Sequence, residues 1–130
     1  HNTIPCTWWD NKDEKALEDI DLFLVDIFDY QNNETQILLE LLSFTLLHNK
    51  KIIVLDRPNL CGNTVQGSIQ RFNVNKKEYN LPCFHGMSIG ELALYCNTYI
   101  LPRPARLHII PMKAYKKSKQ HFFYKKSDIA

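Results

Sequence analysis

Several signatures that would define a site at once are missing from this chain of 130 residues. No cluster of metal ligands, nucleophile elbow, phosphate-binding loop or glycine-rich dinucleotide motif is present. The four cysteines are widely spaced and form no C-x-x-C pair, which leaves a zinc site with little support. We therefore expect no metal and no cofactor. An even number of cysteines permits two disulfides in an exported protein, but buried free thiols are the favoured interpretation of Cys6, Cys61, Cys83 and Cys96.

The chain also has little net charge and no long apolar run. A net charge of +2 is too small to indicate nucleic acid or an anionic membrane as a partner. The longest apolar candidate, residues 37–47, is interrupted by Glu40, Ser43 and Thr45 and falls short of the roughly 20 residues of a membrane span. We expect no membrane span. No signal peptide is visible at the start, and the composition indicates no compartment.

What the sequence does contain is typical of one globular domain. A hydrophobic content of 45% and a charged content of 23% are ordinary values, and the length suits a single domain over residues 1–130. Residues 113–130 form a tail in which lysines alternate with aromatic residues. Such a tail can serve single-stranded nucleic acid, but at a chain end it is more often solvated. Because the rest of the chain has no excess of basic residues, we expect no nucleic-acid partner.

The organising stretch is KKIIVLDRPN, residues 50–59, where an apolar strand ends in four polar or rigid residues. An unbroken apolar run is typical of a strand that is buried on both faces of a parallel sheet. The apolar run at 22–28, the amphipathic helix at 34–48 and the strand at 52–55 predict a strand–helix–strand unit with parallel strands.

The rest of the chain adds further elements around this unit. A capping box at Ser88 and Glu91 predicts a second helix that continues to Tyr99. Residues 106–112 predict a third buried strand, and residues 60–82 commit to no element. A short strand at 3–8 and a short helix at 13–20 are expected near the start.

Polar side chains follow two of these strands and precede the second helix. Because ligands gather at the carboxyl ends of parallel strands, these groups should meet at one edge of the sheet. A helix N-terminus is also a natural anion site, since its first amides are unpaired and its dipole is positive there. The edge therefore suits a ligand with hydroxyls and a carboxylate or phosphate. The residues are Asp26, Asp29, Asp56, Arg57, Asn59 and His85.

Plainer interpretations of these residues stay open. Asp56 could end its strand in an Asx-type turn, with Arg57 as a solvated charge. Glu91 is expected to cap its helix rather than to act in catalysis. Asp26 lies in an apolar run, where acids are rare unless they are paired. Asp29 and Asp56 could form the carboxylate pair of a glycosidase, whose separation the sequence does not give.

Several of these residues coincide with a known pattern, and the match extends over roughly residues 4–117. The chain resembles the NamZ-type exo-β-N-acetylmuramidase family, formerly a domain of unknown function. The resemblance is carried by DRPN at 56–59, Gly62, VQG at 65–67 and HGMSIGELA at 85–93, with DIFD at 26–29 and IIPM at 109–112.

The resemblance implies a Rossmann-like, three-layer α/β domain with a mostly parallel sheet, incomplete relative to the family. It further implies removal of terminal N-acetylmuramic acid from peptidoglycan fragments, a peptidoglycan-derived saccharide as partner, and a secreted or periplasmic location. The candidate catalytic residues are Asp26, Asp29 and Asp56. The candidate substrate-binding residues are Asp56, Arg57, Asn59, His85, Gly86 and Ser88.

The chain departs from the family pattern at several points. Phe28 stands where the family has Gln, and Gln66 where it has Glu. The resemblance implies that the family's opening segment, with its catalytic glutamate, would precede His1, and that its second domain would follow Ala130. An inactive or fragmentary relative that binds sugar or serves as a structural module is therefore the alternative. A flavodoxin-like nucleotide binder is a third, against which the missing phosphate loop argues.

Overall fold

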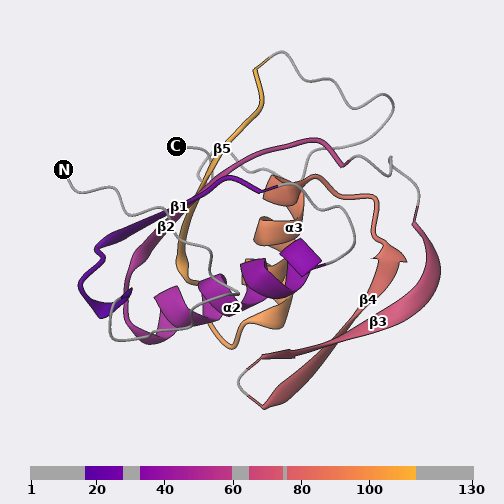
Figure 1. Ribbon diagram of the computed structural model, residues 1–130, viewed down its shortest axis with the longest axis horizontal. Coiled ribbons are helices and arrows are strands. Elements are labelled where there is room, and N and C mark those ends of the chain that lie inside the picture. Colours follow the sequence, from indigo (N-terminus) through magenta and orange to yellow (C-terminus); the bar gives the residue numbers. More distant parts are fainter. Residues whose placement is uncertain (1–16, 28–32, 60–64, 75, 114–130) are drawn as a thin grey trace.

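The computed structural model describes residues 17–27, 33–59, 65–74 and 76–113. The strand expected at 3–8, the first half of the helix expected at 13–20, Asp29 and nearly all of the basic tail lie outside these residues. Figure 1 shows the arrangement of the elements. They are β1 (Leu22–Val25), α2 (Asn33–Leu47), β2 (Lys51–Leu55), β3 (Gln66–Val74), β4 (Lys77–Phe84), α3 (Ile89–Tyr95), the π-helical segment η1 (Cys96–Ile100) and β5 (Arg106–Ile110).

The main sheet is parallel and has the strand order β1-β2-β5. Its register places Phe23 beside Ile52, and Val54 beside Ile109. Strand β1, helix α2 and strand β2 form the expected strand–helix–strand unit, and the predicted α/β class with a mostly parallel sheet and flanking helices is confirmed. All three strands end at the same edge, which brings Asp26, Asp56 and Pro111 into one region.

Side chains of the sheet alternate between a buried and a more open face. Phe23, Val25, Ile52 and Val54 join one apolar core with residues of α2 and α3. On the other face Leu24 is 64% exposed. The expectation of strands buried on both faces is thus wrong for β1 and β5, where buried residues are flanked by exposed ones. An unbroken apolar run does not reveal how many faces are covered, because both faces carry apolar side chains.

Helix α2 supplies the central layer of the core. Leu38 and Leu42 are fully buried, and they lie four residues apart on the same face of the helix. Asn49 has a φ of 52°, the left-handed conformation that ends helices and that asparagine tolerates better than most residues. The helix therefore stops close to where the sequence predicted, and the chain turns directly into β2.

Residues 66–84 form an antiparallel β-hairpin, although the sequence pattern indicates neither a helix nor a strand for most of this stretch. The hairpin packs through Phe72, Val74 and Leu81, which are all buried in the same core cluster as α2. Gln36 of α2 donates from Nε2 to the backbone oxygen of Asn73 at 2.9 Å. In Figure 1 the hairpin lies at lower right, well apart from the parallel sheet, with α2 between them.

Helix α3 begins with the predicted capping box. Ser88 Oγ accepts the N–H of Glu91 at 3.3 Å, and the Glu91 carboxylate accepts the N–H of Ser88 at 3.3 Å. The helix does not continue to Tyr99 as an α-helix, since residues 96–100 are π-helical. The Leu101 N–H donates to the carbonyl of Cys96, five residues earlier, at 3.0 Å. No helix in the described parts of the chain is long and apolar enough to cross a bilayer.

Candidate functional site

Asp56 ties the end of β2 to the first turn of α3. Its backbone N–H donates to the Ile110 carbonyl at 2.9 Å, which extends the sheet by one hydrogen bond. The residue is only 4% exposed, and its Oδ1 accepts the N–H of Gly90 at 2.7 Å. A Cβ atom on Gly90 would lie 2.9 Å from Asp56 Cγ, Asp56 Oδ1 and Ile109 Cγ2. Glycine is therefore the residue that allows this close approach.

Arg57 and Asn59 hold the same loop to α3. The Arg57 carbonyl accepts the N–H of Ile89 at 3.2 Å, and Asn59 Nδ2 donates to the Met87 carbonyl at 3.0 Å. Pro58 fixes its own φ and restricts Arg57 to extended backbone. The two sequence motifs are thus one hydrogen-bonded unit, residues 56–59 with residues 87–90, which we call the clasp.

The clasp changes the interpretation of the N-terminus of α3. This helix has seven residues, and its leading amides donate to acceptors of the chain itself. The acceptor of Gly90 is Asp56, the acceptor of Ile89 is Arg57, and Ser88 and Glu91 bond each other. The expectation that these amides form an anion site is corrected here, because internal carboxylates already occupy the positive end of the helix.

The remaining predicted sugar-binding residues lie inside the fold. His85 is 5% exposed, and its Nδ1 accepts the N–H of Met87 at 3.1 Å. Ser88 is 1% exposed, and Gly86 is buried with a φ of 70°, a conformation that favours glycine. These contacts indicate that the HGMS segment shapes the loop that supports the site. Direct contact of these three residues with a sugar stays a prediction.

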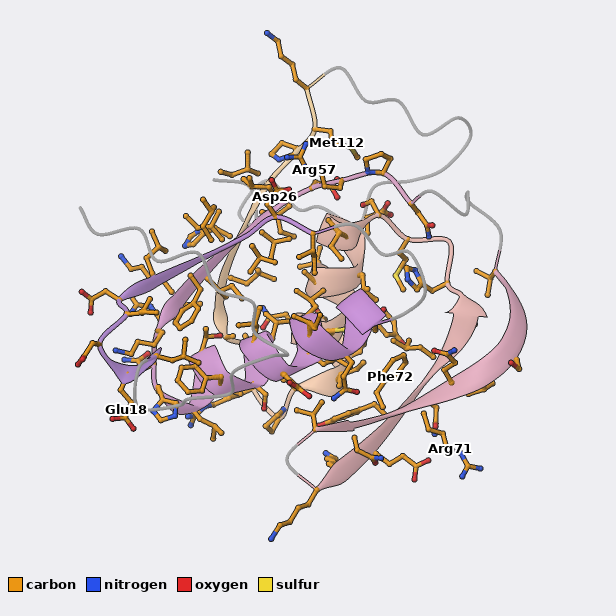
Figure 2. The ribbon with its side chains drawn as sticks, in the orientation of Figure 1. Glu18, Asp26, Arg57, Arg71, Phe72 and Met112 are labelled. Carbon is orange, nitrogen blue, oxygen red and sulfur yellow. The ribbon has the colours of Figure 1, made fainter. Side chains whose placement is uncertain are left out.

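Asp26 and Arg57 form the charged pair of this edge, and they come from the ends of different strands. Arg57 Nε lies 2.7 Å from Asp26 Oδ1, and Nη2 lies 2.9 Å from Oδ2, which is a two-point contact between guanidinium and carboxylate. The side chain of Arg57 is 38% exposed and that of Asp26 is 48% exposed. Figure 2 shows both near Met112 at the upper edge of the molecule.

This pairing further stabilises the ionised form of Asp26. The hydrogen bond from Arg57 lowers the pKa of Asp26 below its ordinary value of 3.8; burial opposes this shift, and the positive charge of Arg57 adds to it. The same hydrogen bond and charge raise the pKa of Arg57. Because Arg57 makes protonation of Asp26 less favourable than for an ordinary aspartate, Asp26 is poorly suited to donate a proton as a general acid.

A cleft with a volume of about 580 Å³ opens at the carboxyl ends of β2 and β5. This volume lies within the range of small-molecule sites. Arg57 and Lys113 bring positive charge to its lining, and Ile110, Pro111 and Met112 bring apolar surface. Its full lining is Leu55, Asp56, Arg57, Ile110, Pro111, Met112 and Lys113.

Of the lining residues, only Asp56 and Arg57 are among the predicted site residues; the others are Leu55, Ile110, Pro111, Met112 and Lys113. A signal was available, because β5 was predicted as a strand and its carboxyl end had to share the edge with β2. Asn59 and His85, which were predicted there, contact Met87 instead of lining the cleft. Within residues 17–27, 33–59, 65–74 and 76–113, no group of three His, Cys, Asp or Glu side chains could hold a metal ion.

A parallel sheet with flanking helices and a charged cleft at its carboxyl edge defines an α/β protein with a candidate site at the strand ends. The chain belongs to the family described as "Exo-beta-N-acetylmuramidase NamZ, N-terminal", whose profile matches residues 8–129. No curated protein matches the chain.

Two solved structures from Bacteroides fragilis NCTC 9343 share the fold. The DUF1343 family protein BF0379 is 31% identical with a TM-score of 0.66, over 83% of this chain and 33% of its own. The DUF1343 family protein BF0371 is 29% identical with a TM-score of 0.60, over 80% of this chain and 29% of its own. This chain thus spans about a third of the length of these relatives.

Proposed function

We propose that this chain provides the muramic-acid-binding edge of a glycosidase that removes terminal N-acetylmuramic acid from peptidoglycan fragments. The family supports a glycosidase-like role. The observation that supports this choice of substrate is the position of Arg57 in the cleft lining, where its guanidinium is paired with Asp26. N-acetylmuramic acid differs from N-acetylglucosamine by a lactyl ether that bears a carboxylate, and arginine is the residue best shaped to bind a carboxylate at two points.

The other cleft residues fit the rest of such a sugar. Lys113 adds a second positive charge, and Pro111 and Met112 offer apolar surface to a methyl group or to the carbon face of a pyranose ring. A mixture of apolar lining with a few placed polar groups is the usual make-up of a small-ligand site. In this proposal Arg57 and Lys113 bind the carboxylate, while the clasp keeps the backbone of Arg57 in place.

The proposal assigns different roles to the three candidate catalytic aspartates. A glycosidase needs a carboxylic acid that is protonated when the leaving group departs. Asp26 has a lowered pKa and pairs with Arg57, which does not suit that step. Asp56 Oδ1 accepts the N–H of Gly90, and in this proposal Asp56 holds the clasp together. Asp29 keeps the role of candidate acid or base.

The internal contacts of the aspartates also favour a second candidate function. Asp26 and Asp56 both make internal contacts, and Gln66 stands where the family pattern has a carboxylate. A chain with this set of groups could bind the sugar without cleaving it. Sugar binding is then the whole function of the cleft, and no product forms.

One pair of assays separates these functions. The purified chain is incubated with an aryl β-N-acetylmuramide to follow chromophore release, and it is titrated with N-acetylmuramic acid by calorimetry. Release supports the glycosidase, and binding without release supports the sugar-binding relative. A folded chain that neither binds nor cleaves would overturn both.

A matched pair of variants assigns the binding to the cleft. Arg57→Gln should weaken binding of N-acetylmuramic acid by about tenfold or more, because a hydrogen-bonded charge contact is lost. Glu78→Gln is the control, since Glu78 forms an exposed ion pair with Arg71 on the hairpin at 3.4 Å. An equal effect of the two variants would remove Arg57 from the site.

A further inference from the structure

The main chain around Arg57 is held at both ends of the residue. The preceding amide, of Asp56, bonds to Ile110 of β5 at 2.9 Å, and the Arg57 carbonyl bonds to the Ile89 amide at 3.2 Å. Pro58 removes further backbone freedom on the other side. What these contacts leave variable is the long side chain of Arg57, which has many rotamers in solution.

Asp26 restricts that side chain from a separate strand. Its two carboxylate oxygens contact Nε and Nη2 at 2.7 and 2.9 Å, so both the position and the plane of the guanidinium are specified. Asp26 follows β1, whose Val25 pairs in register with Val54 of β2. The orientation of the guanidinium is therefore set by the sheet itself.

We infer that Asp26 is a positioning residue that holds the Arg57 guanidinium so that the cleft selects sugars bearing a carboxylate over neutral sugars. The inference rests on the proposed function and deepens it, because it names the residue behind the choice between two closely related sugars. A group that is ordered before binding loses less conformational freedom when the ligand arrives, which strengthens binding. Asp26 touches Arg57 and acts through it.

Asp26 has a second effect of opposite sign. Its negative charge repels a ligand carboxylate that lies nearby, although salt and solvent screen charges at such an exposed site. If Asp26 served only as a counter-ion that occupies Arg57, its removal would strengthen binding of carboxylated sugars. If it positions Arg57, its removal weakens that binding. The two accounts therefore predict changes in opposite directions.

The test compares N-acetylmuramic acid with N-acetylglucosamine on the full chain and on Asp26→Asn, at physiological salt, by heteronuclear NMR titration. Asparagine has a similar shape, but its amide nitrogen cannot accept the second guanidinium hydrogen bond. We expect the preference for the carboxylated sugar to fall roughly two- to tenfold, with binding of the neutral sugar unchanged. An unchanged or increased preference overturns the inference.

A double-mutant cycle shows whether Asp26 acts through Arg57. In an Arg57→Lys background the two-point contact is already lost, so Asp26→Asn should have little further effect on the preference. Equal effects in both backgrounds would contradict a positioning role. Glu78→Gln is again the charge control, and Asp26→Ser replaces Asp26→Asn if the latter does not fold.

The proposed function and this inference can fail separately. If the unaltered chain binds neither sugar, the proposed function fails. If the chain prefers N-acetylmuramic acid and Asp26→Asn keeps that preference in full, the proposed function stands and the positioning role of Asp26 is wrong.

Discussion

Asp26 and Asp56, which the sequence presents as equivalent candidates, have different roles in the structure. Asp56 is buried and accepts a hydrogen bond from the Gly90 N–H, while Asp26 is half-exposed and pairs with Arg57. Both follow apolar strands, so their positions at the sheet edge could be predicted from the sequence. Which one turns inward depends on the arrival of α3, more than 30 residues later in the chain, and that could not be predicted.

The close approach of Gly90 to Asp56 predicts that one added methyl group at Gly90 destabilises the fold. Alanine normally stabilises a helix relative to glycine by about 1 kcal/mol. Gly90→Ala should instead destabilise the chain by about 1–3 kcal/mol, because the new methyl would lie 2.9 Å from Asp56 and Ile109 side-chain atoms. Urea denaturation measures the change. An increase in the free energy of unfolding would show that the clasp is looser than described.

The Asp26–Arg57 pair predicts a pH dependence with a definite sign. The pKa of Asp26 is lowered by Arg57 from its ordinary 3.8, so the pair contributes stability above that pH. This contribution is lost as the pH falls through the lower pKa of the folded state. In an NMR titration the Asp26 carboxyl should have its midpoint below 3.8 and shift upward in Arg57→Gln. Equal midpoints in the two proteins would contradict the pairing.

At the scale of elements, local patterns were predictable and long-range pairings were not. The capping box at Ser88 and the end of α2 near Asn49 depend on residues close in sequence, and both are confirmed. The hairpin of β3 and β4 was missed, although residues 71–74 alternate polar and apolar as strands do. The π-helical turn at residues 96–100 has no sequence signal that separates it from the last turn of an α-helix.

The hairpin should depend strongly on the packing of Phe72. Phe72 is 6% exposed and belongs to the central core, so Phe72→Ala should reduce the free energy of unfolding by about 3–5 kcal/mol. Ile69, on the same strand, is 60% exposed and provides the matched control. Ile69→Ala should change stability by no more than about 0.5 kcal/mol. Thermal melts of the two variants test this, and similar losses would mean that the hairpin does not pack as described.

For the whole molecule, the sequence predicted the edge that holds the site better than the lining of the cleft. Parallel strands must end together, so Asp26 and Arg57 could be placed at one edge from their positions after two apolar strands. Met112 and Lys113 were missed, although the predicted third strand gave a signal for this edge; that β5 lies directly beside β2 follows only from the strand order β1-β2-β5. The buried free thiol expected of Cys96 is confirmed, and burial raises its pKa to about 12.

The central claim is that the cleft at the carboxyl edge of the sheet binds a sugar through its carboxylate. Its most direct test is an amide NMR map of the chain titrated with N-acetylmuramic acid. The account predicts shifts at Arg57, Met112 and Lys113, with none at Lys76 at the hairpin turn, and much weaker shifts with N-acetylglucosamine. Shifts that avoid the cleft, or that are equal for the two sugars, would contradict it.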